Sequence, residues 1–178
     1  MLVQDKIFSS IWFENEKILI IDQTKLPHKF VIKELKSLSD FTKAIVNMEV
    51  RGAPLIGITA LFGIANEMRK DSSLASLECA LKTLRKTRPT AVNLFWALNS
   101  IENLLRKTKK KLRNEIAIDF ANKMALQDKV INNKIGENGY KIFKEILSKK
   151  KTKELNLLTH CNAGWLATVD WGTAISPI

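Results

Sequence analysis

Apolar and polar positions along the chain follow two periods, one typical of strands and one typical of helices. Near the amino terminus, short apolar runs at 11–13 and 17–22 flank the polar turn Glu14-Asn15-Glu16, and a third run, 30–32, follows a loop. Short apolar runs separated by such a turn are typical of a β-hairpin. We therefore expect the chain to begin with a small antiparallel sheet.

From Ser39 onward, apolar residues recur at the helical spacing of three or four positions. The pattern predicts a helix capped by Ser39 or Asp40, and then a helix over 54–69 that is apolar on nearly all sides. A helix with no polar face is buried, so we expect the 54–69 helix at the centre of the core. Ser73 is placed to cap the helix that follows.

The second half of the helical pattern contains longer elements. Thr90 is placed to cap a helix held by Leu94, Leu98, Ile101 and Leu105. A long helix begins near Leu112, and we expect Gly136 and Gly139 to bend or end it before a last helical stripe over 140–147. The lysine-rich stretch 148–153 then separates a domain over 1–150 from a second one over 151–178.

The second domain starts with an apolar run, 154–159, that enters a polar turn carrying Cys161 and Gly164. The run predicts a strand, and the residues after the turn can start a helix. Open α/β sheets bind their ligands at the carboxyl ends of strands, so a thiol in this turn can meet a substrate. The predicted fold class is therefore α/β overall.

The composition is that of an ordinary globular protein, but it does not identify a binding partner. Apolar residues make up 46% and charged residues 26% of the 178 residues, as in ordinary globular domains. The net charge of +11 attracts anions of any kind. The basic runs 107–113 and 149–153 contain no interleaved aromatic residues, so we expect no nucleic-acid binding.

Two cysteines are too few for a disulfide framework or a zinc cluster. No signal peptide is recognisable at the amino terminus, and no apolar stretch approaches the ~20 residues that span a bilayer. We therefore expect no membrane partner and a cytoplasmic location.

Three sites combine polar or reactive residues with a turn that leads toward a helix: Arg51-Gly52-Ala53-Pro54, Arg88-Pro89-Thr90 with Asn93, and Thr159 to Gly164. Arginine binds phosphate through a planar fork, and a helix amino terminus adds N–H donors. Two such sites close together would hold a phosphorylated ligand. The alternative is that each arginine only forms an ion pair or caps a helix. Cys161 is either a buried, inert thiol or one whose pKa is lowered by a helix start.

Together these segments resemble the methylthioribose-1-phosphate isomerase family. The resemblance rests on five ordered segments: Ile21-Asp22-Gln23-Thr24 with Leu26-Pro27-His28, Val50 to Pro54, Arg88 to Leu94, Asn132 with Ile135-Gly136 and Gly139, and Leu158 to Gly164. The same fold family includes regulatory subunits of the translation-initiation guanine-exchange factor and ribose-1,5-bisphosphate isomerase. The unbroken His160-Cys161-Asn162 with Arg88-Pro89-Thr90 is more like the methylthioribose enzymes.

The resemblance implies that 151–178 is the truncated start of a Rossmann-like domain. It implies conversion of 5-methylthioribose 1-phosphate to 5-methylthioribulose 1-phosphate in methionine salvage, with a phosphorylated pentose as substrate and no cofactor or metal. In that reaction Arg51, Gly52, Ala53 and Arg88 contact the substrate and Cys161 is the catalytic thiol. Because the anomeric oxygen is esterified, an acid must assist ring opening before hydrogen moves between C1 and C2.

The sequence departs from the family in two places. Asp170 stands where glycine is usual and Trp165 replaces a small residue, so both are expected to crowd the turn that carries Cys161. Members of the family also continue into a second half that supplies an acid/base aspartate. We therefore expect the amino-terminal half of an isomerase, with little or no activity alone. The alternative is a non-catalytic regulatory or complementing subunit, and the partner left open is a second copy or the missing carboxy-terminal half.

Overall fold

The computed structural model describes residues 1–3, 5–152 and 154–178. Its larger sheet is antiparallel, in the order β3 (Ile11–Glu14), β4 (Lys17–Ile21) and β5 (Ile32–Leu35), which confirms the expected amino-terminal sheet. The hairpin turn has two residues rather than three, because Asn15 and Glu16 both adopt the positive φ that a tight turn between strands requires.

The start of the third strand was predicted two residues too early. Phe30 packs against the Phe8 ring, with 4.9 Å between the ring centroids, and the pairing with β4 covers Ile32 to Leu35. A second hairpin, β1 (Leu2–Val3) with β2 (Lys6–Ile7), was not predicted, since strands of two residues show no period.

The helices α1 (Leu38–Val46), α3 (Leu74–Arg85) and α4 (Val92–Arg106) follow the predicted pattern, but two of their caps differ. Ser73 caps α3 as expected. The cap of α1 is Ser37 instead of Ser39 or Asp40, and Asp40 completes a capping box by accepting from the Ser37 N–H. The cap position of α4 is Ala91, not Thr90, and it provides no side-chain hydrogen bond.

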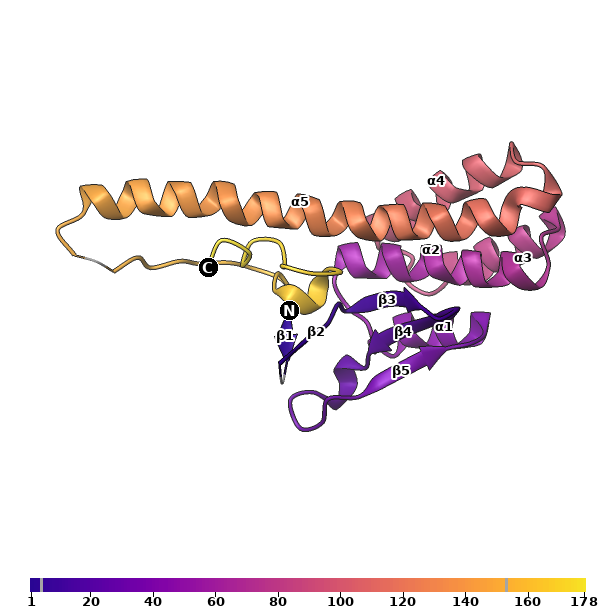
Figure 1. Ribbon diagram of the computed structural model, residues 1–178, viewed down its shortest axis with the longest axis horizontal. Helices are drawn as coiled ribbons and strands as arrows, with labels where there is room; N and C mark the ends of the chain where they lie inside the picture. Colours follow the sequence, from indigo (N-terminus) through magenta and orange to yellow (C-terminus); the bar gives the residue numbers. More distant parts are fainter. Residues whose placement is uncertain (4, 153) are drawn as a thin grey trace.

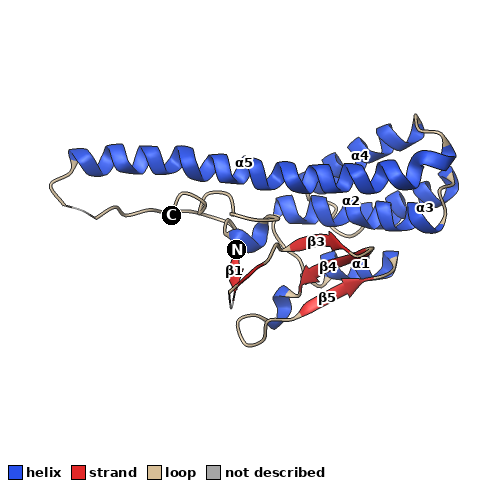
Figure 2. Cartoon of the chain, viewed as in Figure 1, coloured by secondary structure: helices blue, strands red, loops and turns tan. Residues whose placement is uncertain are grey.

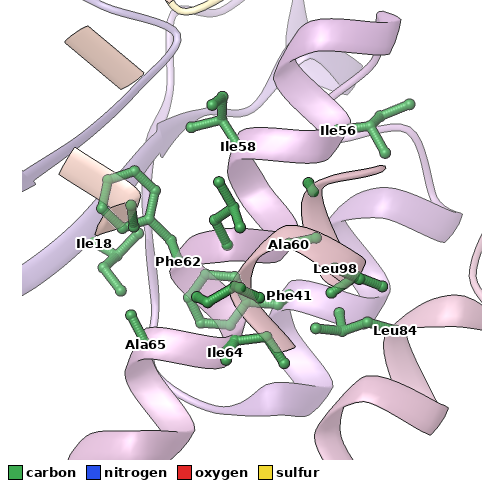
Figure 3. Close-up of a cluster of buried hydrophobic side chains, with 14 of the residues drawn as sticks. Ile18, Phe41, Ile56, Ile58, Ala60, Phe62, Ile64, Ala65, Leu84 and Leu98 are labelled. Carbon is green, nitrogen blue, oxygen red and sulfur yellow. The ribbon is translucent and has the colours of Figure 1, made fainter. Parts of the chain in front are cut away.

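α2 (Ala53–Lys70) lies at the centre of the core, as its apolar sequence predicts. Phe62, Ala65 and other α2 side chains pack against Ile18 of β4 and Phe41 of α1, and Leu84 and Leu98 approach from α3 and α4 (Figure 3). Figure 1 shows the sheet on one side of α2 and α4 and α5 on the other. The mixed arrangement of helices and strands, coloured in Figure 2, confirms the α/β class.

α5 (Arg113–Lys149) is one uninterrupted helix, so the expectation that Gly136 and Gly139 bend or end it was wrong. These glycines instead leave room for the end of the chain. A Cβ on Gly136 would lie 2.6 Å from Ser176 Oγ, and one on Gly139 would overlap the Pro177 ring. Tight packing against 176–177, rather than a change of backbone direction, therefore explains both glycines.

The expected strand at 154–159 does not form. Residues 154–160 are extended, and the structure pairs them with no strand in the residues it describes. A strand needs a neighbour for its backbone N–H and C=O groups, and Leu158 is fully exposed here. Lys153 of the lysine-rich stretch lies outside the described residues. The division into domains at residue 150 stays a prediction.

Three single turns of 3-10 helix complete the described elements: η1 (Gln23–Lys25), η2 (Lys110–Leu112) and η3 (Trp165–Ala167). Among the helices that the structure describes, none is long and apolar enough to cross a membrane.

Candidate functional site

The amino end of α2 is the first part of the site. Gly52 occupies the cap position with φ +104°, a conformation that favours glycine, and Pro54 lies in the first turn. A Cβ on Gly52 would overlap Ala167, so the chain can pass this point only because glycine has no side chain. Arg51 and Ala53, on either side of Gly52, are exposed.

The amino end of α4 lies beside the amino end of α2. A Cβ on Gly57 would be 3.1 Å from the carbonyl oxygen of Asn93, so the amino-terminal parts of the two helices are in close contact. Pro54 and Asn93 line one cavity of about 120 Å³. The loop that carries Arg88 precedes α4 directly. The structure therefore brings the two predicted arginine turns to the same end of the helical layer.

The bonding of the arginines distinguishes the two readings of Arg51 and Arg88. The sequence has six arginines, and four of them donate hydrogen bonds to protein groups: Arg69, Arg85, Arg106 and Arg113. Within the described residues, neither Arg51 nor Arg88 forms an ion pair or a side-chain hydrogen bond. The ion pairs and side-chain hydrogen bonds of the described residues therefore give no support to the alternative that both arginines serve only as ion-pair or capping groups.

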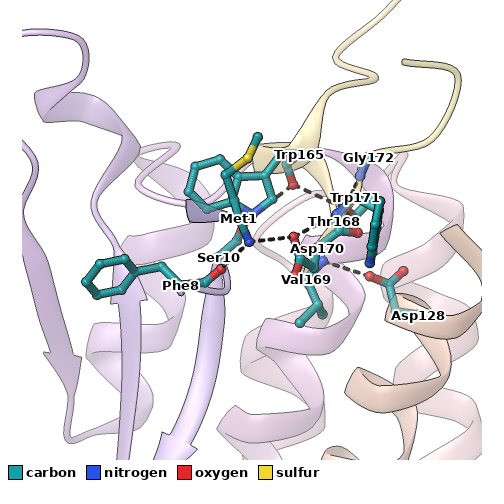
Figure 4. Close-up of polar contacts among 10 residues, drawn as sticks. All are labelled: Met1, Phe8, Ser10, Asp128, Trp165, Thr168, Val169, Asp170, Trp171 and Gly172. Carbon is teal, nitrogen blue, oxygen red and sulfur yellow. Dashed lines mark hydrogen bonds and ion pairs between the residues drawn. The ribbon is translucent and has the colours of Figure 1, made fainter. Parts of the chain in front are cut away.

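The carboxyl-terminal segment 163–172 reaches the same end of α2 and is fixed by three elements. Gln23 Nε2 donates to the Leu166 carbonyl oxygen at 2.7 Å. The Ser10 N–H donates to the Val169 carbonyl oxygen at 2.9 Å, and the Val169 N–H donates to Asp128 Oδ2 at 2.7 Å (Figure 4). Hydrogen bonds from η1, from Ser10 just before β3 and from α5 therefore hold this segment over Gly52.

Asp128 is the residue that sequence reasoning missed. It lines the cavity of Pro54 and Asn93, and its Oδ1 accepts from Asn132 Nδ2 at 3.1 Å. Burial raises the pKa of its carboxyl group above the usual value, although the two hydrogen bonds act in the opposite direction. The available signal was the spacing of four between Asp128 and Asn132, which places both side chains on one face of a helix.

A comparison with known protein families matches the part of the chain that contains these site residues. The family model described as the initiation factor 2 subunit family matches residues 49–174. That range contains both arginine turns, Asp128 and the segment over Gly52. The chain belongs to the initiation factor 2 subunit family.

Curated methylthioribose-1-phosphate isomerases are among the proteins that this chain resembles. The chain is 50% identical over 165 residues to a methylthioribose-1-phosphate isomerase of Methylorubrum extorquens, which covers 93% of this chain and 45% of the relative. It is 47% identical to that of Brucella anthropi, over 100% of this chain and 50% of the relative. The chain thus spans about half the length of the curated relatives it matches.

Solved structures of the family show the same fold. The chain is similar to 5-methylthioribose 1-phosphate isomerase from Pyrococcus horikoshii, with a TM-score of 0.82, 36% identity and coverage of 96% of this chain and 48% of the other. It is also similar to translation initiation factor eIF-2B, subunit delta, from A. fulgidus, with a TM-score of 0.80, 35% identity and coverage of 96% and 50%.

The two departures from the family resemblance meet at the amino terminus. The Met1 amino group donates to Asp170 Oδ1 at 3.0 Å, and Trp165 and Asp170 line one cavity beside Met1 (Figure 4). Asp170 therefore forms an ion pair with the amino terminus of the chain. Ser10 bonds to the neighbouring residue, Val169, in the same segment. Neither contact involves Cys161.

Cys161 itself is exposed and has φ +72°. The helix expected to start after the cysteine is only the single 3-10 turn η3. In the described residues no hydrogen bond joins Cys161 to Arg51 or Arg88. The structure thus assembles the two arginine turns and the segment after the cysteine, with the thiol on the exposed side.

Proposed function

We propose that this chain supplies the amino-terminal half of the active site of an aldose-ketose isomerase that converts 5-methylthioribose 1-phosphate to 5-methylthioribulose 1-phosphate. The observation that carries the proposal is the placement of Arg51 and Arg88, which form no ion pair or side-chain hydrogen bond within the described residues, just before the adjacent amino ends of α2 and α4. The names of the most similar curated relatives support the substrate. In this proposal the arginines, with Gly52 and Ala53, bind the phosphate side of the sugar.

The proposed role of Cys161 follows from the chemistry of the substrate. A sugar whose anomeric oxygen carries phosphate cannot open to the free aldehyde without protonation of the ring oxygen, and hydrogen must then move between C1 and C2. In this proposal Cys161 is the acid, or the group that stabilises the transition state. The matching acid/base group lies in the half that this chain does not span.

The size of the cavity supports a half-site. The cavity beside Pro54 and Asn93 has about 120 Å³, whereas pockets for small molecules usually have roughly 300–1,000 Å³. Further walls are therefore needed to enclose a pentose phosphate.

Ligand binding by the arginine variants tests the proposal. We expect 5-methylthioribose 1-phosphate to bind the chain weakly, and Arg51→Gln and Arg88→Gln each to weaken binding by about tenfold, which is about 1.4 kcal/mol. Arg106→Gln, which removes an exposed arginine bonded to Glu102, is the control and should leave the affinity unchanged. Equal affinity in all four proteins, measured by isothermal titration calorimetry, would overturn the assignment.

A second function is favoured by the likeness to the delta subunit of a translation initiation factor. In this alternative the chain is a non-catalytic regulatory or complementing subunit, and the site binds a phosphorylated effector. Turnover by the chain when it is combined with the other half of an isomerase would exclude a purely regulatory role.

A further inference from the structure

The second half of α5 carries an apolar stripe that solvent reaches. Ile131, Ile135, Ile142 and Ile146 are spaced by four, seven and four residues, which puts them on one face of the helix. Their exposed fractions are 58%, 40%, 57% and 39%. In the first half of α5, by contrast, alanines of the helix are buried and pack against the core.

The stripe lies on a part of α5 that has few neighbours. Figure 1 shows α5 extending well beyond α2, with only the extended carboxyl-terminal segment beside it. Ser176 and Pro177 of that segment pack at Gly136 and Gly139, and they leave the isoleucines uncovered. A helix with an apolar face normally packs that face against another element, so the stripe indicates an absent partner.

The stripe is continuous with the candidate site. Ile131, at its start, lines the same cavity as Asn93 and Asp128, and so does Trp96, which is 54% exposed. An element that covers the stripe would therefore also reach the cavity and supply walls to it.

We propose that the isoleucine stripe of α5 (Ile131, Ile135, Ile142 and Ile146), together with Trp96 of α4, is the docking surface for the second half of a full-length isomerase. The proposal rests on the proposed function, and it adds the surface and the kind of partner. The relatives are about twice the length of this chain, so each of them contains a polypeptide of suitable size beyond the matched part.

Charge favours this occupant over a second copy of the chain. Residues 129–151 contain seven lysines and two glutamates, so two copies placed stripe to stripe would bring like charges together. The partner surface is expected to be apolar at its centre and acidic at its rim. Raising the salt concentration should consequently weaken the complex, because the lysines at the rim are exposed.

Co-expression tests the docking surface without any measurement of turnover. The 178-residue chain, carrying an affinity tag, is produced together with the part of the Methylorubrum extorquens relative that lies beyond the match. We expect the two polypeptides to purify in equal amounts. Backbone amides of 137–149 should exchange hydrogen more slowly in the complex than in the free chain.

Matched variants on one helix identify the face. Ile142→Lys with Ile146→Lys should weaken the complex by about tenfold or more, whereas Leu126→Lys should not. Leu126 is 62% exposed on the same helix and lies about 140° around it from Ile131 at ~100° per residue. Unchanged helical content in circular dichroism shows that the variants fold.

Three outcomes would overturn the proposal: no co-purification, an equal effect of the variants on both faces, or a homodimer of the chain that the Ile142 and Ile146 variants dissociate. A complex that forms through the stripe but shows no isomerase activity leaves the docking surface standing and contradicts the proposed function. If the complex is active but the stripe variants do not weaken it, the proposed function stands and the docking surface is contradicted.

Discussion

Asp128 connects α5 to the segment that lies over Gly52, through its hydrogen bond from the Val169 N–H. Asp128→Asn keeps the shape of the side chain but replaces one acceptor oxygen by a donor, so either Val169 or Asn132 loses its acceptor. We expect a loss of about 1–2 kcal/mol in the free energy of unfolding. Urea denaturation measures it, and Asp119→Asn, at an exposed position of the same helix, should have almost no effect.

The raised pKa of Asp128 predicts the direction of a pH effect. Burial favours the protonated form in the folded protein, whereas the unfolded chain ionises near its ordinary value of about 3.9. As pH rises from that value through the folded-state pKa, the unfolded state loses its proton first, so stability from this group falls. The stability advantage of the native protein over Asp128→Asn should therefore narrow as pH rises from about 4 through the raised folded-state pKa of Asp128. A gap that widens over this range would contradict the assignment.

Single residues differed in how far sequence could place them. The sequence indicated Arg51 and Arg88 as candidate anion-binding residues because arginine next to a helix start can bind an anion together with the N–H groups of that helix end, and this role stays a prediction. Asp128 and Gln23 were not, since their partners are backbone groups of a segment about 41 and 143 positions away in the chain, and such contacts leave no local pattern.

At the scale of elements, α5 and the end of the chain depend on each other at two glycines. Gly136→Ala and Gly139→Ala should each favour the helix itself by up to about 1 kcal/mol, since alanine is the better helix former. Both also place a Cβ where Ser176 or Pro177 lies, so 173–178 should detach. Limited proteolysis of this segment should become faster by several fold.

Asn138→Ala provides the control for the glycine variants. Residue 138 is exposed on the same helix, so the change improves helix propensity without touching 176–177. If it releases the end of the chain as readily as the glycine variants do, close packing at Gly136 and Gly139 is not what holds the segment.

Helices and strands were predicted correctly where the spacing of apolar and polar residues in the local sequence determines them. α2 and α3 were confirmed because an apolar core helix and a serine cap are both visible within a few residues. The unbroken α5 and the unpaired 154–160 were not predictable in the same way. Glycine within a helix, or an apolar run without a partner, is decided by tertiary neighbours rather than by the run itself.

At the scale of the whole molecule, we propose that the isomerase site is built from two halves. In this proposal the chain contributes Arg51 and Arg88, the segment after Cys161 and a cavity of about 120 Å³, and it spans about half the length of the curated relatives it matches. Loss of one acid/base group alone typically costs 10²–10⁴-fold in rate, so the isolated chain should turn over slowly or not at all.

The most direct test is the rate of 5-methylthioribulose 1-phosphate formation by the purified chain, alone and together with the second half of the Methylorubrum extorquens relative. We predict no detectable turnover by the chain alone, turnover by the combined halves, and loss of that turnover in Cys161→Ser. Turnover by the isolated chain at the rate of a full-length relative, or full activity of the combined halves with Cys161→Ser, would contradict the account.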